Sequence, residues 1–178
     1  MIFYSKTGKT KRIALRLKDL LSNAGLHVDI YEIKHRKEYL DKLLHLNPRL
    51  IMDTLLNKHV EFVGAEDFNP EGYDVIIIGS PIWYNTVVPA IKSFIKTFRG
   101  RIGNKPIICF TTSTLNIDYS TKFKEILQSL AYNVIFCKSF TAIEVERTIN
   151  EFANNIITKL KSMLNSTSGV KDIRAILL

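Results

Sequence analysis

The run Val75-Ile76-Ile77-Ile78-Gly79-Ser80-Pro81-Ile82-Trp83-Tyr84-Asn85-Thr86 decides the fold of this 178-residue chain. Its first half is uniformly apolar, which is typical of a strand buried on both faces of a parallel sheet. From Gly79 onward, a proline and two adjacent aromatic residues indicate a loop. The run therefore predicts a strand over Tyr73–Ser80 with a loop at its carboxyl end.

Similar apolar runs recur along the chain and alternate with amphipathic stretches. This alternation is typical of an α/β protein whose doubly wound parallel sheet carries helices on both faces. The other predicted strands are 1–4, 27–33, 106–112 and 134–142. The predicted helices run for about 15 residues from Lys9, over Thr86–Phe98, over Ser120–Ala131 with Ser120 or Thr121 as N-cap, and over Val145–Leu164.

The connection between the second and third strands, residues 34–72, is longer than a usual crossover. Helical spacing of apolar residues predicts two short helices within it, Glu38–Leu46 and Pro48–Leu56, separated by the break that Pro48 imposes. Two interpretations stay open: a cap near a ligand, or an enlarged pair of packing helices with no role at a site.

Length and composition indicate one cytoplasmic domain. We expect a domain over residues 1–165 and a tail over 166–178, whose apolar end would allow a homodimer. No apolar run reaches the length of a membrane span, and the start does not resemble a secretion signal. Cys109 and Cys137 lie in separate apolar runs without a Cys-x-x-Cys motif, which predicts reduced core thiols.

The chain carries 25 Lys and Arg residues against 17 Asp and Glu residues, a net charge of +8. The basic residues are dispersed along predicted helices, so we expect no nucleic-acid binding and instead an acidic partner or an anionic ligand. The four histidines, His27, His35, His45 and His59, do not have metal-ligand spacing. We expect them to be surface or structural residues and expect no metal site.

The loop after the first strand has the composition of a phosphate-binding turn. Its residues are Ser5, Lys6, Thr7, Gly8, Lys9 and Thr10. The hydroxyls, a glycine without a Cβ and the N-terminus of the following helix together suit a terminal phosphate. The ending Gly8-Lys9-Thr10 is shared with nucleotide-triphosphate P-loops, but Phe3 stands where that motif requires glycine, which argues against this alternative.

The loops after the third and fourth strands suit a flat ring. In the first of them, Trp83 and Tyr84 can flank a ring system. Ligands of open parallel sheets lie outside the carboxyl ends of the strands, where both loops are expected. The candidate ring-binding residues are Pro81, Ile82, Trp83, Tyr84 and Asn85 from the first loop and Thr112, Ser113 and Thr114 from the second.

These motifs, together with Pro89-Ala90-Ile91-Lys92-Ser93-Phe94-Ile95, resemble the flavodoxins and the flavodoxin-like NAD(P)H:quinone reductases over residues 1 to about 160. The resemblance implies a five-stranded parallel sheet in the order 2-1-3-4-5 and bound FMN. It also implies that the first loop holds the phosphate and that the other two loops surround the isoalloxazine. The short first strand, the enlarged crossover and the basic charge depart from the family pattern.

Three functions remain open from the sequence. The first, which we favour, is an FMN-binding redox protein that carries electrons to or from a protein partner, such as an acidic ferredoxin. The second is an NAD(P)H-dependent quinone or flavin reductase, and the third is a binding module of the same fold without a cofactor. No side-chain catalytic group is evident, because the flavin would supply the redox chemistry, so the sequence leaves open whether the protein is an enzyme.

Overall fold

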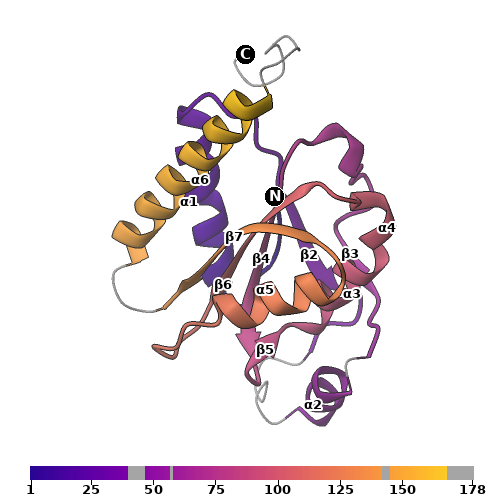
Figure 1. The fold of residues 1–178 in the computed structure, drawn as a ribbon. Helices are drawn as coiled ribbons and strands as arrows, with labels where there is room; N and C mark the ends of the chain where they lie inside the picture. The colour runs from indigo at the N-terminus through magenta and orange to yellow at the C-terminus, as the bar shows by residue number, and fades with distance from the viewer. Residues whose placement is uncertain (40–46, 57, 142–144, 168–178) are drawn as a thin grey trace.

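The computed structural model describes residues 1–39, 47–56, 58–141 and 145–167. It shows a central sheet with helices on both faces (Figure 1). In chain order the elements are β1 (Ile2–Tyr4), α1 (Lys9–Asn23), β2 (Tyr31–His35), α2 (Pro48–Leu55), β3 (Phe62–Val63), the 3₁₀ helix η2 (Pro70–Gly72), β4 (Ile76–Trp83), β5 (Thr86–Val87), α3 (Pro89–Thr97), α4 (Arg99–Ile102), β6 (Pro106–Thr112), α5 (Ser120–Ser129), β7 (Asn133–Phe140) and α6 (Val145–Thr167).

The sheet confirms the predicted α/β class but is not a purely parallel five-stranded sheet. Five parallel strands lie in the order β2-β1-β4-β6-β7, which is the expected relative order. Two short antiparallel strands are added to them. β3 pairs with β2 and makes the edge of the sheet, and β5 pairs with the end of β4. The prediction missed both because each is only two residues long.

Several element boundaries differ from the predictions. β2 begins at Tyr31 rather than at residue 27, and β4 begins at Ile76 and continues to Trp83. The segment Thr86–Val87 is a strand and not the start of α3, because the chain reverses at Tyr84 and Asn85, where φ is 48° and 58°. This is the positive-φ turn that suits a two-residue hairpin.

The helix ends also differ in detail from the predictions. The N-cap of α5 is Tyr119, without a side-chain capping bond, so the prediction of Ser120 or Thr121 was wrong. Asp118 instead satisfies one of the free N–H groups at the start of α5, since its Oδ1 accepts a hydrogen bond from the Ser120 N–H at 2.7 Å. The predicted helix Glu38–Leu46 lies mostly outside the described residues, whereas Pro48–Leu56 is observed as α2, capped by Asn47.

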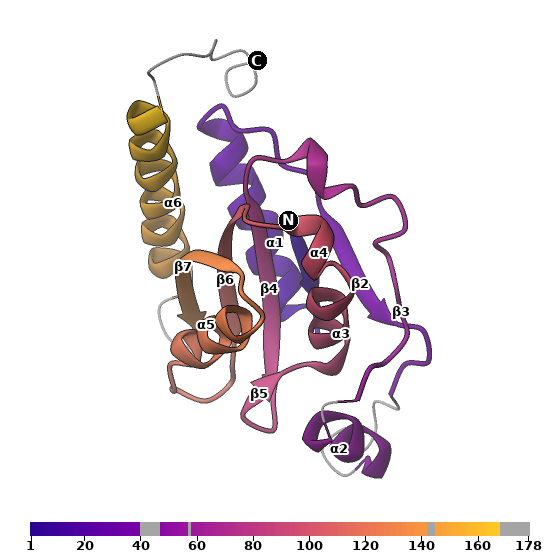
Figure 2. The same ribbon diagram turned by 45° about the vertical axis from the view of Figure 1, so that its right-hand side comes forward.

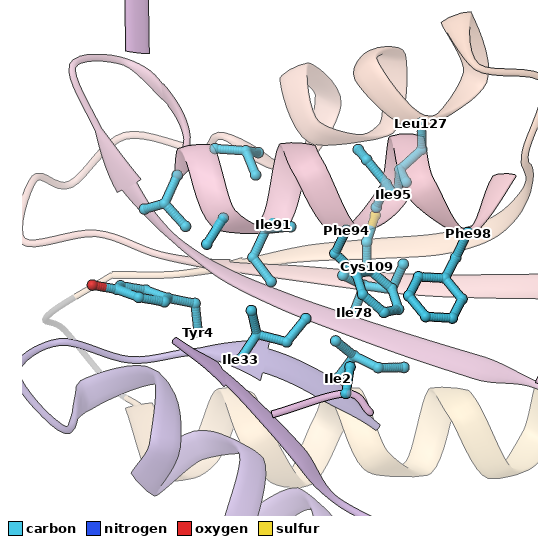
Figure 3. Packing of buried hydrophobic residues seen from close by; sticks show 14 of the residues in the cluster. Ile2, Tyr4, Ile33, Ile78, Ile91, Phe94, Ile95, Phe98, Cys109 and Leu127 are labelled. Atoms are coloured by element: carbon cyan, nitrogen blue, oxygen red, sulfur yellow. The ribbon is translucent and has the colours of Figure 1, made fainter. Parts of the chain in front are cut away.

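Two apolar cores cover the two faces of the sheet. On one face, α1 and α6 pack against β1, β4 and β6. On the other face, α3 and α5 pack against the same strands. Figure 3 shows Ile91 and Phe94 of α3 directed toward Ile78. Within the described residues, no helix is long and apolar enough to cross a membrane.

The two cysteines form a disulfide, so the prediction of reduced thiols was wrong. Cys109 in β6 and Cys137 in β7 are direct partners in the parallel register, and their Cα atoms are 4.5 Å apart. This Cα separation is within the range that a disulfide spans. The sequence separation of 28 residues conceals the pairing, which only the strand register reveals.

Gly79 sits at the centre of the sheet, where β4 passes beneath the ring of Phe110. A Cβ added at Gly79 would overlap that ring, with Phe110 Cε1 at 2.6 Å and Cε2 at 2.8 Å. Gly79 is the register partner of both Phe3 in β1 and Phe110 in β6. Glycine at this position therefore allows β1, β4 and β6 to lie side by side with Phe110 folded over them.

We predict that Gly79→Ala lowers the free energy of unfolding by about 1–3 kcal/mol, because a buried ring must shift to accept the methyl group. Urea unfolding followed by circular dichroism measures this change. Gly100→Ala is the matched control, since nothing lies within 4 Å of its added Cβ and it stands in the helix α4. Equal stability of Gly79→Ala and the wild type would contradict the packing argument.

Candidate functional site

The first loop forms an open turn between β1 and α1. Gly8 is the N-cap of α1 with φ of 83°, in the left-handed region that favours glycine. No side chain caps the helix, its first turn contains no acidic residue, and space is open above Gly8. Since the first N–H groups of a helix lack intrahelical partners, the turn presents donors and a positive dipole end to an anion.

The predicted phosphate-binding residues do not all face the open side of this turn. Thr7 and Gly8 are exposed and Lys9 is half-buried. The Ser5 hydroxyl accepts a hydrogen bond from the Lys11 N–H at 3.1 Å, which shapes the turn. Lys6 is directed toward the crossover, where its Nζ donates to Glu38 Oε2 and to the Tyr39 carbonyl, each at 3.0 Å.

Hydrogen bonds join the third loop to the two other loops. The Thr10 and Thr112 hydroxyls are 2.8 Å apart in a buried contact between the start of α1 and the end of β6. The Tyr119 hydroxyl donates to Asn85 Oδ1 at 2.7 Å, which joins the start of α5 to the β4–β5 turn. Figure 2 shows the β4–β5 hairpin and the β6–α5 loop at the same edge of the sheet. The three predicted loops therefore converge.

Trp83 and Tyr84 do not lie together as a pair. The Trp83 side chain is 9 % exposed and belongs to the core beneath α3, whereas Tyr84 is exposed at the tip of the hairpin. Trp83 is the last residue of β4, whereas Tyr84 stands in the turn with φ of 48°, so the chain reverses between them and the two side chains have different surroundings. The remaining second-loop residues, Pro81, Ile82 and Asn85, are half-buried or exposed.

Trp83 packs in a cluster of four rings with Tyr4, His35 and Tyr39, which we call the aromatic cluster. Tyr4 and Tyr39 meet Trp83 edge-on, with ring centroids at 5.4 Å and 6.3 Å, and the His35 ring lies nearly parallel to the indole at 6.5 Å. The Tyr39 hydroxyl donates to Asp53 Oδ2 of α2 at 2.9 Å. The cluster thus fastens the crossover to the end of β4. Figure 3 shows Tyr4 at the margin of the core.

His35 is buried among these rings, and its Nε2 has no hydrogen-bond partner in the described part of the chain. Burial is the largest influence on this imidazole and lowers its pKa to about 4, although the Glu38 carboxylate opposes the change. Burial together with the hydrogen bond to Asp53 raises the pKa of Tyr39 above its ordinary value. Both side chains are therefore neutral at pH 7.

Sequence reasoning overlooked several residues at this edge. Tyr119 carried no signal, because its link to Asn85 depends on the hairpin turn. Leu115 and Ile117 are 54 % and 48 % exposed beside the candidate ring-binding residues Thr112, Ser113 and Thr114. The sequence could have indicated this exposed apolar surface, because two large apolar residues stand within an otherwise polar loop. In the described residues no three metal-ligating side chains gather.

Comparisons with known proteins identify the family and agree with the fold. The family model described as Flavodoxin matches residues 1–156. No curated protein matches the chain. Among solved structures, a flavoprotein from Lactobacillus acidophilus NCFM, in complex with FMN, is 22 % identical, with a TM-score of 0.64 over 78 % of this chain and 89 % of its own.

Two further solved structures share the fold. A putative flavoprotein from Bacteroides eggerthii is 23 % identical, with a TM-score of 0.66 over 87 % of this chain and 94 % of its own. A flavodoxin from the domain Archaea is 14 % identical, with a TM-score of 0.56 over 90 % of this chain and 96 % of its own. At these identities the structural likeness establishes the fold and not the ligand.

We predict that stability falls between pH 6.5 and pH 4 through His35. Its pKa is lowered on folding from 6.5 to about 4, so the unfolded chain takes up the proton first as the pH falls. The loss of free energy of unfolding is complete below pH 4 and amounts to about 3 kcal/mol. Urea unfolding at a series of pH values measures it.

The comparison variant is His35→Phe, which should lose this part of the pH dependence while keeping an aromatic ring in the cluster. His59→Gln is the control for the loss of a histidine, because His59 is exposed and lies outside the aromatic cluster. Parallel pH profiles for wild type and His35→Phe would contradict the assignment.

Proposed function

Because the chain belongs to the flavodoxin family, we propose that it binds FMN and exchanges electrons with a protein partner. The observation that supports this most directly is the joining of three loops at one sheet edge, through the Thr10–Thr112 and Tyr119–Asn85 hydrogen bonds. One loop suits a phosphate and the other two suit a ring, which is the pair of features that a flavin mononucleotide requires. FMN supplies the one- and two-electron chemistry when bound.

In this proposal the first loop binds the phosphate. The exposed Thr7 hydroxyl and the N–H groups at Gly8, Lys9 and Thr10 donate to it, and the start of α1 adds its positive dipole end. The structure of the turn fits this task, since a Cβ at Gly8 would still leave open space and no acidic residue stands in the first turn. Lys6 acts indirectly, because its ion pair with Glu38 holds the crossover near the loop.

The second and third loops flank the ring in this proposal. Pro81 to Asn85 supply one wall and Thr112 to Thr114 the other, and the Tyr119–Asn85 bond fixes their relative position. Trp83 supports this wall from beneath as part of the aromatic cluster, and Tyr84 is the aromatic residue that would contact the ring. The aromatic side chain and hydroxyls there would bind the ring face and its polar rim.

The surface around this edge favours a protein partner. Tyr84, Leu115 and Ile117 are exposed apolar side chains on the two ring-binding loops. Together with the net charge of +8, they suit an acidic redox protein that docks by apolar contact and is attracted by charge. We therefore favour an electron carrier over an NAD(P)H-dependent reductase.

We predict that the apoprotein binds FMN more tightly than riboflavin and that Thr7→Ala narrows this difference. Loss of one hydrogen bond to a charged phosphate should weaken FMN binding about tenfold, and riboflavin binding should not change. Quenching of flavin fluorescence during titration measures both constants. Ser22→Ala, at the far end of α1, is the control. Equal affinity for FMN and riboflavin would overturn the phosphate-loop assignment.

We predict that the FMN-loaded protein is reduced slowly by NADPH alone under anaerobic conditions. Reduction by an acidic ferredoxin should be faster and should slow as ionic strength rises, because salt screens the charge attraction. Stopped-flow absorbance of the flavin follows both reactions. Rapid reduction by NADPH without a protein partner would instead favour the reductase.

A further inference from the structure

A groove between α3 and α5 contains three lysines and lies outside the three loops of the candidate site. Its volume is about 270 Å³. Lys92 and Lys96 of α3 and Lys122 of α5 line it together with aliphatic side chains. Thr86, which follows the β4–β5 turn, also lines it, so the groove reaches the residue after the second loop.

Two of the three lysines in this groove, Lys92 and Lys122, have no acidic partner within the described protein. Neither Lys92 nor Lys122 forms an ion pair with a carboxylate of residues 1–39, 47–56, 58–141 or 145–167. The Lys92 side chain is only 9 % exposed. Burial, and repulsion from Lys96 and Lys122, lower the pKa of Lys92. Gathering these cations therefore costs free energy that a bound anion would recover.

The position of the lysines within their helices adds to this cost. Lys92 and Lys122 stand near the N-termini of α3 and α5, where the helix dipole disfavours cations. Neither first turn contains the acidic residue that is favourable at that place. Both ammonium groups therefore contribute positive potential to the same groove, and neither is offset by an acidic residue in the first turn of its helix.

Apart from Thr86 and Ser129, the rest of the lining is apolar. Ile95, Ile126 and Leu130 line the groove beside the lysines. A volume of about 270 Å³ exceeds what a lone phosphate needs, since one water occupies roughly 30 Å³ of liquid. The lining suits a ligand with a phosphate at one end and an apolar or flat group at the other.

We propose that the groove between α3 and α5 is a second anion site, which binds a phosphate monoester that carries a flat or apolar group. Lys92 and Lys122 hold the phosphate, and the aliphatic residues contact the attached group. This site is separate from the first loop, and its occupation does not depend on the proposed function.

The test uses the apoprotein and three probes: 2′-AMP, adenosine and inorganic phosphate. Isothermal titration calorimetry measures affinity, and amide chemical shifts show whether a probe binds at α3 and α5 or at the first loop. We expect 2′-AMP to bind at α3 and α5, inorganic phosphate to bind there at least fivefold more weakly, and adenosine not to bind.

Variants identify the residues. Lys122→Gln, on an exposed side chain, and Lys92→Met, which keeps the length of a buried one, should each weaken 2′-AMP binding about tenfold or more. Lys124→Gln is the matched control, because it removes the same charge from α5 outside the groove. If Lys124→Gln weakens binding as much as Lys122→Gln does, the anion is attracted only by the general positive charge of the protein, and the proposal fails.

Other outcomes would also overturn the proposal. Adenosine binding as tightly as 2′-AMP would exclude a phosphate site, and inorganic phosphate binding equally tightly would exclude a role for the apolar lining. Shifts confined to residues 5–10, with binding lost in Thr7→Ala, would move the anion to the first loop. None of these titrations contains flavin. If the protein failed to bind FMN, the result for the groove would therefore still stand.

Discussion

The close approach of Phe110 to Gly79 is the constraint on which the candidate site depends. It lets β1, β4 and β6 pair in register at the centre of the sheet. Each candidate loop leaves the carboxyl end of one of these strands. Their spacing is therefore fixed by the sheet, and the Thr10–Thr112 hydrogen bond becomes possible only because the strands end together. A rigid scaffold that presents variable loops is the general way in which open α/β sheets form ligand sites.

The crossover after β2 is tied to this edge by the aromatic cluster and by two polar contacts. Lys6 pairs with Glu38, and Tyr39 binds Asp53 of α2. These contacts place the start of the crossover near the site, because Glu38 contacts the first loop and Tyr39 contacts the end of β4. They also leave a buried imidazole, His35, whose charge state is set by the packing around it rather than by solvent.

The sequence predicted the parallel strands and the main helices because their apolar periodicity is local. α1, with its apolar positions at helical spacing, begins at Lys9 as expected. The β4–β5 hairpin was missed, since it depends on positive φ at Tyr84 and Asn85, residue types that do not demand it. The disulfide was missed for a different reason: Cys109 and Cys137 meet only through the register of β6 and β7.

The candidate site was predicted at the level of loops and less well at the level of side chains. Composition indicated that residues 5–10, 81–85 and 112–114 would form one site. In the structure Thr10 bonds to Thr112, and Asn85 bonds to Tyr119 beyond the third of these segments, so the loops are near one another while their role stays a prediction. Composition did not indicate that Lys6 would pair with Glu38 or that Trp83 would be buried, because both depend on a crossover distant in sequence.

The chain contains a single tryptophan, and it lies where the crossover packs against the end of β4. Its intrinsic emission therefore comes from one known environment, an indole enclosed by two tyrosines and a histidine. Separation of the crossover from the sheet would expose this indole to water and shift the emission to longer wavelength while the strands stayed paired. The protein thus carries its own optical probe for local opening at this edge, distinct from global unfolding.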